Sequence, residues 1–229
     1  MQGRPPVKIK LAFRLNSPNG RDNRPDASWL QRQVHRIELE RTGDFRHVEL
    51  YFPRDTSGVT DHPGGWISSV QGQPIQFMPN LIRASDYCYC SAFIPEEEYL
   101  KCLIFAMAQV GKPHNVERSM RAGLMYILWK PFQLLVPEIR TDMNSWYCSE
   151  LLTAILAQSP VTRLDGLVPS RSMPQCIYDR TRKVAVEREA TVPVPGLRQP
   201  PFLWKLDYHN DEDMFVKVGQ ALQSFTLSK

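Results

Sequence analysis

Residues 7–15, VKIKLAFRL, decide the first element of the fold. Apolar side chains occupy every second position from Val7 to Leu15, and Lys8, Lys10 and Arg14 lie between them. Successive side chains of a strand point to opposite faces, so a period of two places the apolar set on one face. We therefore predict a half-buried β-strand over residues 7–15.

Residues 47–52, HVELYF, repeat the same alternation. One face of this predicted strand is apolar, and the other carries side chains capable of acid–base chemistry. The apolar members are Val48, Leu50 and Phe52, and the polar or reactive members are His47, Glu49 and Tyr51.

The remaining pattern predicts short strands and helices separated by turns that are rich in proline and glycine. Strands are expected at 66–70, 75–77, 86–94 and 176–178, and loops at 16–25, 55–65 and 168–174. Helices are expected near Asp26 and at 95–110, 120–129 and 146–158, and an extended segment at 192–201. The predicted buried stripes are Leu100, Leu103, Ile104 and Met107 in the helix at 95–110 and Leu151, Leu152, Ile155 and Leu156 in the helix at 146–158. This order of elements predicts an α+β fold, with helices packed against a mainly antiparallel sheet.

Composition excludes several classes of protein. With 229 residues, 42% hydrophobic and 23% charged, the chain is long enough to bury a full core as one globular domain. The net charge of +4 comes from 28 basic and 24 acidic residues, so no nucleic-acid partner is expected. The most apolar stretch, residues 123–136, is interrupted by Lys130 and Pro131 and is shorter than the roughly 20 residues of a membrane span.

Cysteine usage predicts a reducing compartment. Five cysteines make an odd number, and residues 1–10 lack the apolar core of a secretory leader. We therefore expect a cytoplasmic location. Cys88-x-Cys90, with Cys102 and Cys176, lacks the usual spacing of zinc ligands, so these four are interpreted as packing residues and neither a metal nor a cofactor is expected.

Cys148 differs from the other cysteines because it falls in the first turn of a predicted helix, where the helix dipole stabilises a thiolate. His47 is a candidate partner for its proton, and Glu49, on the same strand face, is placed to orient the imidazole. The spacing alone leaves a second interpretation open. In it, Cys148 is a small buried hydrophobe, His47 is a structural strand histidine and Glu49 lies on a solvated face.

Four landmarks in chain order add to this interpretation. They are RHVELYF at 46–52, QVGKPHN at 109–115, WYCSEL at 146–151 and PSRSMPQCIY at 169–178. These segments resemble the His-bearing strand, the G-x-P-Y segment, the Y-C-S-E-L nucleophile helix and the P-x-S-P-x-x-L/I-Y closing segment of the circularly permuted NlpC-like branch of the papain-fold superfamily. Two departures stand out. His114 occupies a position where the family commonly has tyrosine, and Gln175 and Cys176 replace more usual residues.

The resemblance implies a single permuted NlpC-like domain over 1–229, with its site core at about 47–178 and a C-terminal extension at 180–229. It implies a thiol hydrolase, either a cysteine peptidase or amidase or an acyltransferase. Cys148 would attack the acyl carbon, His47 would protonate the leaving group and Glu49 would orient His47. Trp146, Tyr147 and His114 are the candidate lining of the substrate pocket.

The expected substrate is a peptide, amide or lipid ester, because all of these bonds are open to the same triad. In relatives that act on lipid-like acyl groups, a segment such as 124–136 forms a lid or contacts a membrane, so peripheral membrane contact is a further interpretation. Relatives include viral proteins. The alternative is therefore a catalytically idle interaction or virion structural protein that retains the fold, located in the host cytoplasm or the virion.

Overall fold

The computed structural model describes residues 6–15, 45–81, 87–119, 121–122, 143–189 and 204–206, with side chains as far as residue 184. The features predicted at 16–25, near Asp26, at 192–201 and in most of 120–136 lie outside these ranges. The strands are β1 (Val7–Leu15), β2 (Phe45–Phe52), β3 (Gly65–Ser68), β4 (Gln76–Met78), β5 (Tyr87–Ile94) and β6 (Trp204–Leu206). The helices are α2 (Glu96–Met107), α4 (Cys148–Leu156), the short 3-10 helix η3 (Pro169–Arg171) and α5 (Pro174–Glu189).

The described strands form one sheet in the order β4-β3-β2-β1-β5-β6, and each neighbouring pair is antiparallel. In the register, Leu11 of β1 lies opposite Leu50 of β2 on one side and Cys90 of β5 on the other. The predicted α+β class with a mainly antiparallel sheet is confirmed.

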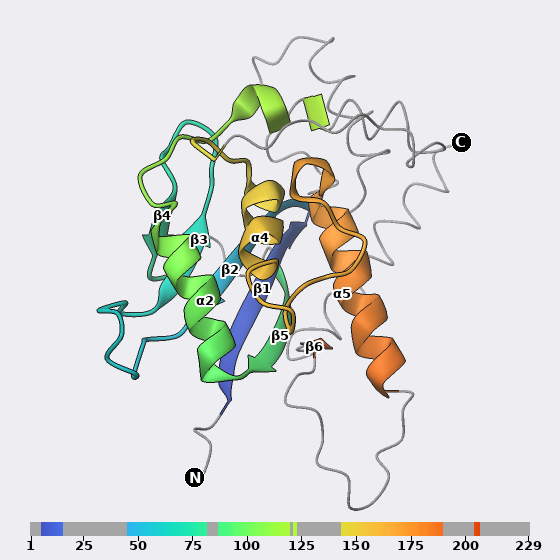
Figure 1. The fold of residues 1–229 in the computed structure, drawn as a ribbon. Helices are drawn as coiled ribbons and strands as arrows, with labels where there is room; N and C mark the ends of the chain where they lie inside the picture. The colour runs from blue at the N-terminus through green and yellow to red at the C-terminus, as the bar shows by residue number, and fades with distance from the viewer. Residues whose placement is uncertain are drawn as a thin grey trace, which may run out of the picture.

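Helices α2, α4 and α5 lie over one face of this sheet (Figure 1). The predicted apolar face of β1 supplies the core beneath them, since Ile9, Leu11 and Phe13 are fully buried. Helix α4 is the innermost of the three, because every residue from Ser149 to Leu156 is buried. A helix closed in on all sides in this way holds its first residue at a fixed place relative to the sheet. In the described ranges, no helix has the length and apolar character that crossing a membrane requires.

The predicted buried stripe of α2 is wrong in part. Ile104 and Met107 are 51% and 40% exposed, and the buried residues are Tyr99, Cys102, Leu103 and Ala106. Both sets have helical spacing and share Leu103, so periodicity alone cannot choose between them. Tertiary contacts decide. The Tyr99 hydroxyl donates to the Pro53 carbonyl at 2.7 Å, and Cys102 lies 3.7 Å from the Thr162 hydroxyl.

The strand predicted at 176–178 is also wrong, because these residues lie in the first turns of α5. A run of three residues is too short to separate the two periods, and Pro174, at the first helical position, starts a helix. Tyr178 then packs edge-on against Phe13 and lies 4.4 Å, between ring centroids, from Phe45. The helix thus covers the end of β1 and β2.

Candidate active site

Cys148 is the first residue of α4. Tyr147 before it is extended, with φ −100° and ψ 164°, and its carbonyl accepts the first helical hydrogen bond from the Leu151 N–H at 2.9 Å. Cys148 as a residue is partly exposed, and its sulfur accepts hydrogen bonds from the N–H groups of Val48 and Ser149. Backbone donors and the positive end of a helix dipole both favour a thiolate here. The predicted position of Cys148 at a helix start is confirmed.

A β-bulge lies next to His47 in β2. Arg14 of β1 pairs with His47, but the next residue, Leu15, pairs with Phe45, so Arg46 is an extra residue on β2. The bulge breaks the alternation and puts both Phe45 and Val48 into the core. His47 thereby sits next to a kink in its strand, at the end of β2 that packs against α4.

Glu49 holds one nitrogen of the His47 ring. The distance from His47 Nε2 to Glu49 Oε1 is 3.2 Å, and the two side chains are 15% and 1% exposed. A hydrogen bond links His47 to Cys148 as well, and Nδ1 is the ring nitrogen that remains for it. The three residues proposed from sequence are therefore brought together, with His47 between the thiol and the carboxylate.

The electrostatics of the site favour an ion pair. Burial opposes the charged ring, but the neighbouring Cys148 and Glu49 outweigh burial and raise the pKa of His47 from 6.5 to about 10. Burial likewise opposes a thiolate, yet His47 and the two backbone donors bring the pKa of Cys148 below 9.0. Hydrogen bonds from His47 and Ser68 lower the pKa of the buried Glu49 carboxyl. These neighbours therefore favour the charged forms of all three groups: a thiolate, an imidazolium and a carboxylate.

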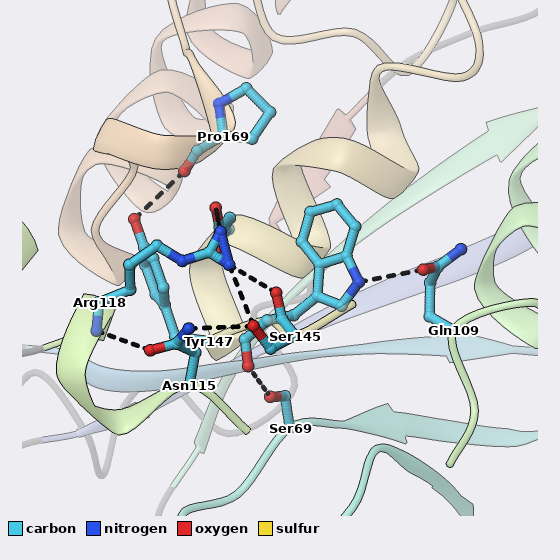
Figure 2. Close-up of polar contacts among 9 residues, drawn as sticks. Ser69, Gln109, Asn115, Arg118, Ser145, Tyr147 and Pro169 are labelled. Atoms are coloured by element: carbon cyan, nitrogen blue, oxygen red, sulfur yellow. Dashed lines mark hydrogen bonds and ion pairs between the residues drawn. The ribbon is translucent and has the colours of Figure 1, made fainter. Parts of the chain in front are cut away.

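The residues just before Cys148 are fixed by a polar network (Figure 2). The Ser145 carbonyl accepts from Arg118 Nη2 at 2.6 Å, and the Trp146 carbonyl accepts from the Ser69 hydroxyl at 3.0 Å. Arg118 also forms an ion pair with Glu150 of α4 at 3.1 Å. The start of α4 is thus held through both its backbone and its first turn.

The candidate pocket residues divide into two groups. The side chains of Trp146 and Tyr147 are 0% and 2% exposed, and they bond to Gln109 and to the Pro169 carbonyl. In this structure they support the site from within and are closed to solvent. His114 is half-buried and bonds to Ser69 at 2.9 Å, and the charge of His47 contributes to lowering its pKa below 6.5, after burial. Of the three, His114 remains the candidate for contact with substrate.

Sequence reasoning missed Ser68, Ser69 and Arg118. Serines at the end of a short strand carry no local signal, and their partners lie 19 and 77 residues away along the chain. Glu150 was visible as part of WYCSEL, but its ion pair with Arg118 joins segments that no periodicity connects.

Cys88, Cys90 and Cys102 are packing residues of the main core, whereas Cys176 is only half-buried. Cys88 and Cys90 are buried and belong to the main core, as two alternate positions of a strand allow. All five cysteines are free thiols. In the described ranges, no group of three or more histidine, cysteine or acidic side chains is arranged to hold a metal ion.

Comparison of the chain with protein-family models, with curated proteins and with solved structures gives no match. The functional argument therefore depends on the geometry of the site.

Proposed function

We propose that the chain is a cysteine hydrolase or acyltransferase of the permuted NlpC-like, papain-fold type, acting on an amide or ester. One observation carries this proposal. His47 lies between the Cys148 thiol, at the start of α4, and the Glu49 carboxylate. The distance from His47 Nε2 to Glu49 Oε1 is 3.2 Å. A nucleophile, a base and a residue that orients the base are the parts that nucleophilic acyl transfer requires.

The arrangement supports a two-step reaction. The Cys148 thiolate bonds to the carbonyl carbon, and the carbonyl π electrons move to oxygen, where backbone N–H groups at the start of α4 stabilise the charge. When this intermediate collapses, the leaving amine or alcohol takes a proton from the His47 imidazolium, and an acyl thioester remains on Cys148. Water or another acceptor then attacks the thioester carbon and gives its proton to the neutral His47. The C–S bond breaks, the acyl product leaves, and the thiolate–imidazolium pair is restored.

The fold is compatible with the permuted type. The His47 strand precedes the Cys148 helix in the chain, and α4 packs against β2 on one face of an antiparallel sheet. This order is the reverse of papain itself. Geometry defines such a site, and chain order does not.

A non-catalytic interaction protein that retains the fold is the second candidate. A pocket of about 370 Å³ lies beside the C-terminal half of α4, lined by residues that include Leu156, Leu164, Leu167 and Arg163. Neither Cys148 nor His47 lines it. This pocket offers a binding place away from the nucleophile, which is the observation that favours the second candidate.

Thiol reactivity tests the first step of the proposal. We would treat the folded protein with iodoacetamide from pH 5 to 10 and quantify alkylation of each cysteine by mass spectrometry. Cys148 should react faster than the other cysteines at neutral pH, with a rate inflection below 9. Cys102 serves as the internal control because burial raises its pKa to about 11. At pH 7, only about one Cys102 in ten thousand carries a thiolate. Equal rates for the two cysteines would contradict the proposal.

Turnover separates the two candidates. A panel of peptide, amide and lipid-ester acyl probes would be offered to the wild type and to Cys148→Ala. Acyl transfer to Cys148, absent in the variant, supports the enzyme. A reactive Cys148 that accepts no acyl group from any probe would favour the interaction protein.

A further inference from the structure

Two consecutive serines lie where β3 ends, beside the site but outside the triad. Ser68 is the last residue of β3 and Ser69 follows it, and each is 2% exposed. Adjacent residues of an extended chain point in opposite directions, so the two hydroxyls serve different partners.

Ser68 bonds to the carboxylate of the triad. Its hydroxyl donates to Glu49 Oε1 at 2.6 Å, and the same oxygen lies 3.2 Å from His47 Nε2. A hydroxyl that donates to a carboxylate makes a short, charge-assisted hydrogen bond, and this distance is typical of one. The bond fixes the rotation of the carboxylate about its last torsion and so keeps Oε1 toward the ring.

We propose that Ser68 is a positioning residue of the site, which acts through Glu49 to hold the His47 imidazolium against Cys148. This inference rests on the proposed function. In this proposal Ser68 acts on the His47 ring only through Glu49 Oε1, the oxygen to which both Ser68 and His47 bond.

Ser69 provides a matched control because its hydroxyl has a neutral acceptor. A hydroxyl has one hydrogen, which Ser69 gives to the Trp146 carbonyl at 3.0 Å. His114 Nδ1, 2.9 Å away, then donates to the Ser69 oxygen. Ser68→Ala and Ser69→Ala therefore each remove one buried hydroxyl of equal exposure, but only the first removes a donor from the triad carboxylate.

The two variants should differ in the titration of His47. Without the Ser68 hydroxyl, Glu49 has fewer donors to its charged form and its carboxylate is free to turn from the ring. The imidazolium then loses part of its stabilisation, so His47 releases its proton at lower pH. The other titratable or charged groups around this pair are unchanged by the substitution: Cys148 from α4, Arg14 from β1, Tyr87 and Tyr89 from β5, and His114 from the segment after α2.

The experiment is an NMR titration of the imidazole resonances from pH 5 to 11, with His47 assigned by the loss of its signal in His47→Asn. The wild type should titrate near 10. Ser68→Ala should titrate about one pH unit lower. Ser69→Ala should stay within about 0.3 of the wild type, because a neutral bond contributes little to the ion pair.

A Ser68→Ala shift no larger than that of Ser69→Ala, or an upward shift, overturns the inference while leaving the proposed function in place. A wild-type His47 that titrates near 6.5 overturns both. If Ser68→Ala does not fold, the isosteric pair Ser68→Thr and Ser68→Val makes the same comparison. The threonine variant should titrate as the wild type does and the valine variant lower, and equal values would refute the role of the hydroxyl.

Discussion

Replacing Arg118 by methionine should destabilise the protein strongly. The Arg118 guanidinium is 8% exposed, pairs with the fully buried Glu150 at 3.1 Å and donates to the Ser145 carbonyl at 2.6 Å. Methionine retains much of the side-chain volume but leaves a carboxylate in the interior without this counter-charge. Removing one partner of a buried ion pair costs about 3–5 kcal/mol, because the remaining charge stays desolvated.

Urea unfolding at pH 7 and 25 °C measures this loss. With a slope of about 2 kcal/mol per molar urea, the midpoint should fall by about 2 M. Arg121→Met is the matched control. Arg121 lies one turn away and pairs with Glu117 at 2.6 Å, but these side chains are 67% and 70% exposed. Exposed pairs contribute less than about 1 kcal/mol, so the control should unfold close to the wild type.

The double variant Arg118→Met/Glu150→Leu completes the cycle. Removing both charges together should recover part of the stability, because no isolated charge then remains in the core. The reasoning is refuted if Arg118→Met unfolds at the same urea concentration as Arg121→Met. It is also refuted if the double variant loses the full sum of the stability losses measured for Arg118→Met and Glu150→Leu separately.

Four further substitutions, one of them a control, test other parts of the structure. Burial holds the pKa of His62, which is 4% exposed against Phe77, below its ordinary 6.5. The unfolded chain therefore binds a proton more readily, and the free energy of unfolding should fall as the pH drops below about 6.5. His62→Leu should lose less stability than the wild type between urea melts at pH 7.5 and 5.5, and equal losses would contradict this. Gly65→Ala should cost about 3 kcal/mol, because the new Cβ would lie 2.9 Å from the Met78 carbonyl oxygen. Gly72→Ala has φ +81° and open space around it, so it should cost only about 1 kcal/mol in the same urea melts. A larger loss of stability for Gly72→Ala than for Gly65→Ala would refute the crowding at Gly65. Tyr99→Phe should lower the free energy of unfolding by about 1 kcal/mol through loss of the bond to the Pro53 carbonyl, and an unchanged urea midpoint would dismiss that bond.

The elements that the sequence predicted well are those whose burial follows a local period. The predicted apolar faces of β1 and β2 supply core residues: Ile9, Leu11 and Phe13 from the first strand, and Val48, Leu50 and Phe52 from the second. Cys148 was placed at a helix start by the apolar stripe that follows it, and that stripe is buried. Local spacing sufficed in these cases because the repeat of apolar residues in the sequence matches the repeat with which side chains return to one face of a strand or helix.

Prediction failed where the local pattern admitted two solutions. α2 offered two helical stripes, and residues 176–178 suited a strand as well as a helix. The bulge at Arg46 has no signal in RHVELYF, yet it puts both Phe45 and Val48 into the core. In each case a contact with a distant segment selected the outcome.

By itself, the sequence determined the α+β class, the strand that carries His47 and Glu49 on one face, and the helix that begins at Cys148. These features follow from hydrophobic periodicity and from the chemistry of helix ends, both of which act over a few neighbouring residues. Only the tertiary structure decided that His47 meets Cys148, that Ser68 holds Glu49, and that Arg118 pairs with Glu150 in the first turn of α4. These contacts join residues between 19 and 101 positions apart in the chain, and their energies depend on burial that exists only once the sheet and helices have packed.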